Sequence, residues 1–277
     1  TLAMEKSQRK SLLHSSSLFL KQLSQVESIL MSSSQHDEIT QKLASYDDGP
    51  GTGLPKGWWS YAVQMYRVSK GLSDPKLLKQ FPNQASNLLE LLETYPPQWS
   101  VITIQESLGD HVYKVTDQQT GKTHLLMAAG LDSMESILDR TYLTFLVNNG
   151  ASLQSIGSLY AFKLSSDELF RYCAYIDSSL FASEGIQGMM LKRFAHVAAL
   201  TAVTPHPNRR IWWAPVDKPA QLHQWSQRSA GISLGSISSQ LFVRASSEQD
   251  VITAAQLIQA DITGEISSVP FKIVHAL

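Results

Sequence analysis

Apolar residues in the first part of the chain recur every three or four positions, which is the spacing of one face of an α-helix. Helical runs are clearest at residues 8–31, 58–71 and 83–95. Between the first two of these runs, residues 47–57 are rich in glycine and proline, a composition that is typical of a flexible linker. The pattern therefore predicts a helical N-terminal region over residues 1–95.

The hydrophobic period changes from helical to alternating after Pro97. A run rich in β-branched residues covers 99–105, and two further alternating runs follow at 111–116 and 122–129. The last two are joined by a short turn that ends at Gly121, a residue able to take a positive φ. We therefore predict a three-stranded antiparallel meander.

A long helix is predicted over residues 132–150, directly after the meander. Asp132 or Ser133 can accept hydrogen bonds from the free amides of a first helical turn, and Asn149 followed by Gly150 is a common helix end. The apolar residues have helical spacing and are Met134, Ile137, Leu138, Leu143, Phe145 and Leu146. Because a helix stripe and a sheet face each need an apolar partner, we expect this helix to pack across the meander.

The rest of the chain mixes strands and helices, so residues 98–277 are predicted to form an α+β domain. The segment 169–176 is compatible with a helix capped by Ser165 and with a strand after a turn; its aromatic and β-branched residues favour the strand. Strands are also predicted at 155–164, 211–213, 239–245 and 265–274, and helices at 184–203, 219–228 and 247–258. The predicted fold class is α+β.

Composition excludes some classes of function. Charged residues make up 17% of the chain, against about 25% in an average protein, and the formal net charge is −1. We therefore expect no broad nucleic-acid binding, which requires a positive surface field. No apolar run approaches the length of about 20 residues that a membrane span needs. The single cysteine, Cys173, forms no internal disulfide and favours a reducing, intracellular compartment, the cytoplasm being the simplest case.

Residues suited to catalysis are scattered along the sequence. No histidine or cysteine spacing matches a metal site, and no cofactor motif is present, so neither a metal nor a cofactor is expected. An enzyme would need a site assembled from distant positions, with Asp110, His111, Cys173, His196 and His206 as its raw material. Cys173 stands among apolar residues, which favours a buried structural thiol.

Two aromatic surfaces are the predicted binding sites. In the first, adjacent arginines can hold an anion and neighbouring indoles can stack on a partner, although one indole packing inward is the alternative. Its residues are His206, Arg209, Arg210, Trp212 and Trp213. The second surface is the pair Trp58 and Trp59. Tryptophan and arginine are the residues most enriched in protein-interface hot spots.

The predicted order of three strands, a long helix and two more strands is similar to the small lobe of protein kinases. The segment Val112–Asp117 resembles the second strand of that lobe. The resemblance implies a kinase-like fold that binds a nucleotide or another anion. The chain departs from the kinase pattern because it lacks the glycine-rich loop, and Leu125–Ala128 stand where the phosphate-binding lysine is expected. A kinase-like fold without transfer chemistry is therefore the form that the resemblance predicts.

The leading hypothesis is a non-catalytic protein-interaction or adaptor domain within a larger assembly, whose partner is another protein chain or a second copy. The low charge, the aromatic pairs and the absence of an assembled catalytic motif favour it. The alternatives are a hydrolase or transferase with a site built from sequence-distant residues, and the kinase-like fold. The sequence leaves open whether the chain is an enzyme.

Overall fold

The computed structural model contains both helices and strands, as the α+β class requires. The residues that it describes are 4–32, 57–132, 137–162, 165–202, 210–217, 233–237 and 240–270. They group into two compact units, which are Thr1–Ser166 with Met190–Ala202, and Asp167–Met189 with Val203–Leu277. The predicted division into a helical region over residues 1–95 and an α+β domain over residues 98–277 stays a prediction.

Helices occupy most of the described residues before the first strand. They are α1 (Lys6–Met31), α3 (Trp58–Leu72), α4 (Pro75–Leu78), the 3₁₀ helix η2 (Asn83–Ala85) and α5 (Ser86–Thr94). The buried apolar side chains of α1 are Leu12, Phe19, Val26 and Leu30, which share one face. Except for Gly57, the linker predicted at 47–57 lies outside the described residues. None of the helices in the described ranges is long and apolar enough to cross a membrane.

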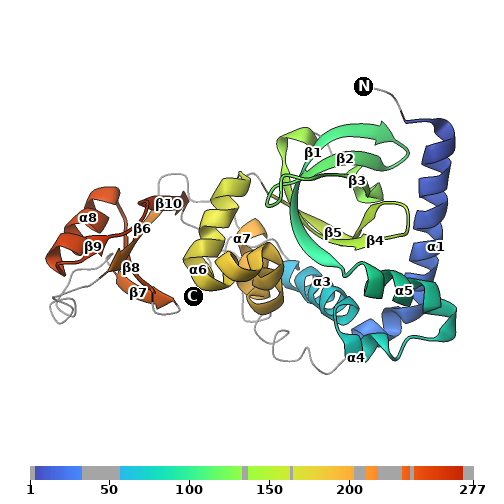
Figure 1. Ribbon diagram of the computed structural model, residues 1–277, viewed down its shortest axis with the longest axis horizontal. Coiled ribbons are helices and arrows are strands. Elements are labelled where there is room, and N and C mark those ends of the chain that lie inside the picture. Colours follow the sequence, from blue (N-terminus) through green and yellow to red (C-terminus); the bar gives the residue numbers. More distant parts are fainter. Residues whose placement is uncertain are drawn as a thin grey trace. The chain divides into compact units, whose positions relative to one another are not determined.

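A closed five-stranded barrel forms the centre of the first unit (Figure 1). Its strands are β1 (Gln98–Gly109), β2 (Val112–Asp117), β3 (Thr123–Met127), β4 (Thr141–Asn148) and β5 (Leu153–Phe162). The order around the barrel is β1-β2-β3-β5-β4, and every pairing is antiparallel except that of β3 with β5. The predicted meander is β1, β2 and β3, but it is part of this barrel and not a separate sheet.

The long helix predicted at 132–150 is wrong. Its second half is strand β4, in which every residue from Thr141 to Val147 is buried. A strand covered on both faces has a continuous apolar run, which periodicity alone does not distinguish from a buried helix. The order of elements that resembled a kinase small lobe is therefore absent from this unit.

The buried apolar side chains that fill the barrel come from β1, β2, β3 and β4, and β5 adds the partly buried Leu153. At one end, Trp99 of β1 packs on Phe145 of β4 and on Phe194, with ring centroids 5.4 and 5.9 Å apart. Phe194 begins helix α7 (Phe194–Ala202), which belongs to the first unit although it comes late in the sequence. The aromatic contacts thus attach α7 to the end of the barrel.

The second unit contains an antiparallel sheet covered by a helix. Its strands are β6 (Arg210–Asp217), β7 (Ser233–Ile237), β8 (Gln240–Ala245), β9 (Asp261–Ile262) and β10 (Ser267–Pro270), in the order β10-β6-β8-β7 with β9 also pairing with β6. Helix α8 (Glu248–Leu257) begins at Ser247, whose hydroxyl accepts a hydrogen bond from the amide of Asp250 at 3.1 Å. Its buried face packs on the sheet in one apolar cluster.

The strand predicted at 169–176 is also wrong, because this segment lies in helix α6 (Ser166–Lys192). Asp167 and Glu168 occupy the first turn, where acidic groups are favoured by the helix dipole. Leu169, Tyr172 and Cys173 are all buried, and their spacing of three and four residues fits one helix face. This spacing outweighs the strand preference of the aromatic residues.

Candidate functional site

The first predicted binding surface lies partly outside the described residues, which include neither His206 nor Arg209. The other three residues are in β6. Trp213 is buried, and Trp212 is half-buried against the apolar cluster under α8. Most of this indole surface is therefore used within the second unit.

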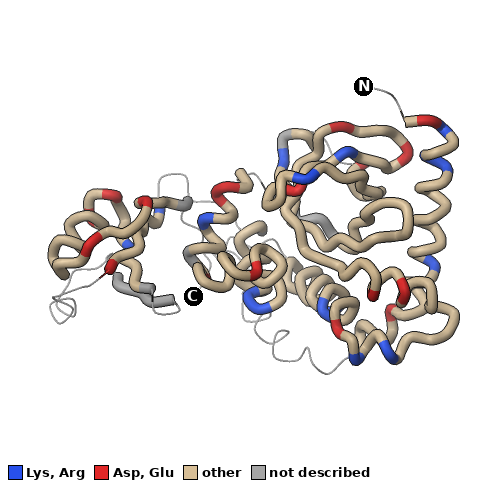
Figure 2. The backbone as a smooth tube through the Cα atoms, in the orientation of Figure 1, with Lys and Arg blue, Asp and Glu red and all other residues tan. Residues whose placement is uncertain are grey.

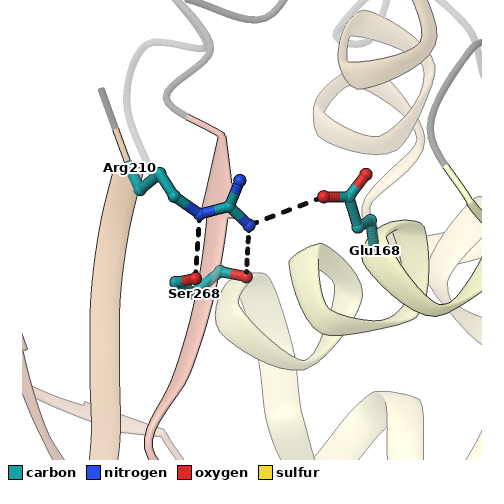
Figure 3. Close-up of polar contacts among 3 residues, drawn as sticks. All are labelled: Glu168, Arg210 and Ser268. Atoms are coloured by element: carbon teal, nitrogen blue, oxygen red, sulfur yellow. Dashed lines mark hydrogen bonds and ion pairs between the residues drawn. The ribbon is translucent and has the colours of Figure 1, made fainter. Parts of the chain in front are cut away.

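Arg210 makes several contacts inside the second unit (Figure 3). Its Nε donates to the Ser268 hydroxyl at 2.9 Å, and its Nη2 donates to the Ser268 carbonyl at 3.3 Å. The same Nη2 lies 3.5 Å from the carboxylate of Glu168 in α6. The guanidinium thus connects β6 with β10 and with α6. These internal contacts use donors that an external anion would need.

The second predicted surface is divided between core and solvent. Trp58 is buried, whereas 36% of Trp59 is exposed and Tyr61 beside it is exposed by 60%. Both exposed residues lie in the first turn of α3. Residues two positions apart on a helix do not face each other, so Trp59 and Tyr61 do not form a joint aromatic site.

The candidate catalytic residues Asp110, His111, Cys173 and His196 do not converge on one site within the described residues. Cys173 is fully buried, and this burial raises the pKa of its thiol to about 12, which opposes formation of a nucleophilic thiolate. His196 is buried in α7, and Asp110 pairs with Arg9 at 3.6 Å. In the described ranges no cluster of His, Cys, Asp or Glu is suited to hold a metal ion.

An open groove of about 440 Å³ lies between α1 and the barrel, and it contains His111. The wall on α1 consists of Leu13, Ser16, Ser17 and Leu20. The opposite wall consists of His111, Met127, Ala129, Gly130, Gln154, Ser155 and Gly157. Apart from His111, the lining has no ionisable side chain, and Figure 2 shows the long uncharged stretch of α1 beside the barrel.

Helix α1 is held at both ends of this groove. On one side Arg9 donates to the carbonyl of Leu108 at 3.2 Å, and Leu12 packs on Val112 and Met127. On the other side the side chain of Gln22 accepts a hydrogen bond from the amide of Leu88, at the start of α5, at 2.6 Å. The groove lies between these two attachments, so its width is fixed by the fold.

The barrel wall of the groove begins at the hairpin between β1 and β2. Asp110 and His111 have φ values of 50° and 64°, as the two central residues of a type I′ turn require. Nδ1 of His111 contacts the carboxylate of Asp132, and the same carboxylate accepts a hydrogen bond from the hydroxyl of Tyr113. The Tyr113 hydroxyl is protonated at neutral pH and can donate, and burial raises its pKa further above the ordinary value of 10.0.

The far part of the wall is the edge of β5. Strand β3 ends at Met127, while β5 continues beyond Gln154, the last residue that it pairs with β3. Ser155 is half-buried and Gly157 is exposed at this edge. The groove therefore combines a helix face, a polar turn and the edge of a strand.

Comparison of the chain with protein-family models, with curated proteins and with solved structures finds no match. Sequence reasoning missed the roles of Asp132, which was expected to cap a helix, and of Leu20 and Gly157. The turn at Asp110 and His111 is the part of the groove that the sequence could have indicated. Nothing in the sequence indicates that Asp132 contacts this turn.

Proposed function

We propose that this chain is a non-catalytic protein-interaction domain, an adaptor or a component of a larger assembly, and that the groove beside α1 receives a segment of its partner. The observation that carries the proposal is an open groove between two points at which α1 is attached to the rest of the first unit. A cleft that is already formed reduces the entropy that binding must overcome.

The exposed surface beside the groove favours a protein segment as the occupant. Leu20 in its wall is exposed by 48%. An exposed leucine in a mostly apolar lining is suited to apolar side chains of a partner and not to a highly charged ligand. The first unit therefore supplies the binding surface in this proposal, and the tryptophans of β6 have a structural role.

Peptide selection tests the proposal directly. A random linear peptide library displayed on phage is selected against the purified protein, and the affinity of the selected peptides is measured for two variants. Ser17→Trp places a bulky side chain in the groove, whereas Ser11→Trp places the same side chain on an exposed position of α1 outside it. We expect Ser17→Trp to weaken binding by about tenfold or more and Ser11→Trp to leave it unchanged.

The control is the folded state of both variants, measured by circular dichroism and thermal unfolding. If no peptide is selected, or if both variants bind the selected peptides as the unchanged protein does, the groove is not the binding site. Light scattering over a concentration series then separates the two kinds of partner, because a second copy of the chain raises the molar mass without any added peptide.

A hydrolase is the second candidate, favoured by the contact of His111 with Asp132 at the groove. A histidine oriented by a carboxylate is a common general base, and the groove contains the hydroxyls of Ser16 and Ser17. Neither hydroxyl is hydrogen-bonded to His111 in the described part of the chain, so the binding domain is the stronger proposal. Fluorophosphonate labelling of either serine that disappears in His111→Ala would reverse this order.

A further inference from the structure

We infer that the segment bound in the groove is extended and adds a strand to the free edge of β5, beyond the end of β3. This inference rests on the proposed function and specifies the class of partner, which is a peptide segment recognised through its backbone. It depends on three relationships in the first unit: the short pairing between β3 and β5, the turn that ends β3, and the position of α1.

The barrel closes through a very short pairing. Strand β3 pairs with β5 at Leu126–Leu153 and Met127–Gln154 only, although β5 is 10 residues long. On its other side β5 pairs with β4 as far as Phe162, with an irregularity in the pairing between Ile156 and Tyr160. Among the residues that the structure describes, no strand pairs after Gln154 with the edge of β5 that faces away from β4.

Polar contacts explain why β3 does not continue along this edge. The amide of Ala128 donates to the carbonyl of His111 at 3.0 Å, and Asp132 binds Tyr113 and contacts His111. These contacts draw the chain after Met127 toward the hairpin of β1 and β2. The space that a longer β3 would occupy is therefore open. Met127 and Gly130 line it on one side, and Ser155 and Gly157 line it on the other.

An extended backbone matches this place better than a helix does. A strand edge presents backbone amides and carbonyls, which another extended chain satisfies with a regular ladder of hydrogen bonds. The internal bonds of a helix leave it no such donors and acceptors along its side. Gly157 has a φ of 72° and its Cβ position is taken by Met65, so we expect the added strand to pair with Ser155 and Ile156, before this irregularity.

The wall on α1 provides a contact for the side chains of the added strand. Leu13 and Leu20 lie across the groove from β5. Because alternate side chains of a strand point to opposite faces, every second residue of the partner segment would meet these leucines. The expected partner is therefore a short extended segment with apolar residues at alternate positions.

A scan of backbone N-methylation tests this inference, with the tightest peptide from the phage selection as the probe. Methylation removes one amide donor at a time and leaves the side chains in place. We expect a loss of affinity of about tenfold at every second residue and little change between. Hydrogen exchange supplies an independent measurement, in which the peptide slows exchange of β5 amides after Gln154 but not of amides in β6.

The outcomes separate the inference from the proposed function. A peptide that is sensitive to Ser17→Trp, yet shows no alternation on methylation and no protection of β5, overturns the added strand while the groove remains the binding site. A peptide that is insensitive to Ser17→Trp removes both. Alternating sensitivity together with protection of β5 supports both.

Discussion

The carboxylate of Asp132 accepts a hydrogen bond from the hydroxyl of Tyr113. Tyr113 is a buried residue of β2, and Asp132 follows the short 3₁₀ helix η3 (Ala129–Leu131) after β3. The bond therefore holds the chain that leaves β3 against the neighbouring strand. The open edge of β5 and the groove both depend on where this chain turns.

Replacing Tyr113 by phenylalanine tests the strength of this connection. Tyr113→Phe keeps the buried ring and removes only the hydroxyl, so we expect the free energy of unfolding to fall by about 1 kcal/mol. Urea denaturation measures the change. In the Asp132→Ala background the same substitution should cost clearly less, since its partner is already absent; equal costs in both backgrounds would mean that the bond contributes nothing.

Gly157 and Gly121 form a matched pair for a test of packing at the β5 edge. Their φ values are 72° and 70°, so alanine is similarly strained at both, by about 1 kcal/mol. A Cβ on Gly157 would also lie 2.0 Å from Sδ of Met65, whereas nothing lies within 4 Å at Gly121. We expect Gly157→Ala to be more destabilising than Gly121→Ala in thermal or urea unfolding.

Met65 provides the control for that comparison. If the excess cost arises from the close approach to Sδ, the double variant Met65→Ala, Gly157→Ala should be less destabilised than the sum of the two single variants. Additive costs would show that backbone strain alone explains Gly157→Ala.

Arg210 should matter more through Ser268 than through Glu168. The ion pair with Glu168 is long, at 3.5 Å, and its side chains are 39% and 26% exposed, so Glu168→Gln should cost less than about 0.5 kcal/mol and less again in concentrated salt. Arg210→Ala also removes two hydrogen bonds to Ser268 and should cost about 1–2 kcal/mol. Urea unfolding at low and high salt compares them; equal losses would contradict this ranking.

Cys173 should make the protein less stable at alkaline pH. Burial raises the pKa of its thiol from 9.0 to about 12, so below pH 9 the thiol is protonated in both folded and unfolded chains and contributes no pH dependence. Between pH 9 and about 12 only the unfolded chain loses the proton, and stability falls by up to about 1.4 kcal/mol per pH unit. Cys173→Ala should lose less stability than the unchanged protein between pH 9 and 10.

A thiol reagent gives a second measurement on the same residue. At neutral pH the buried Cys173 should react with an aromatic disulfide reagent only as fast as the protein opens, and rapidly in denaturant. Rapid reaction of the folded protein would show that the thiol is accessible and that its pKa is not governed by burial.

Local signals in the sequence predicted many of the elements. Helix α1 follows from its apolar spacing, and α8 begins at Ser247, whose side chain caps it. The hairpin of β2 and β3 follows from alternating residues and the turn at Gly121, which has the predicted positive φ. These features depend on residues a few positions apart, and the sequence contains that information directly.

Strand β4 and helix α6 were mispredicted for a common physical reason. The apolar run in β4 fits a buried strand and a buried helix equally well, and only closure of the barrel buries both of its faces. In α6 the aromatic residues favour a strand locally, but burial of Leu169, Tyr172 and Cys173 together requires the helix. Tertiary packing decided both cases.

The sequence by itself determined the α+β class, the low charge, the single thiol and most local turns and caps. The tertiary structure alone decided that the barrel closes, that Asp132 meets Tyr113, and that a groove opens beside α1. The reason is the range of the contacts involved: Arg9, which attaches α1 to the barrel, bonds to a carbonyl 99 residues away. Periodicity and caps report neighbours along the chain, whereas a binding site depends on which distant surfaces pack together.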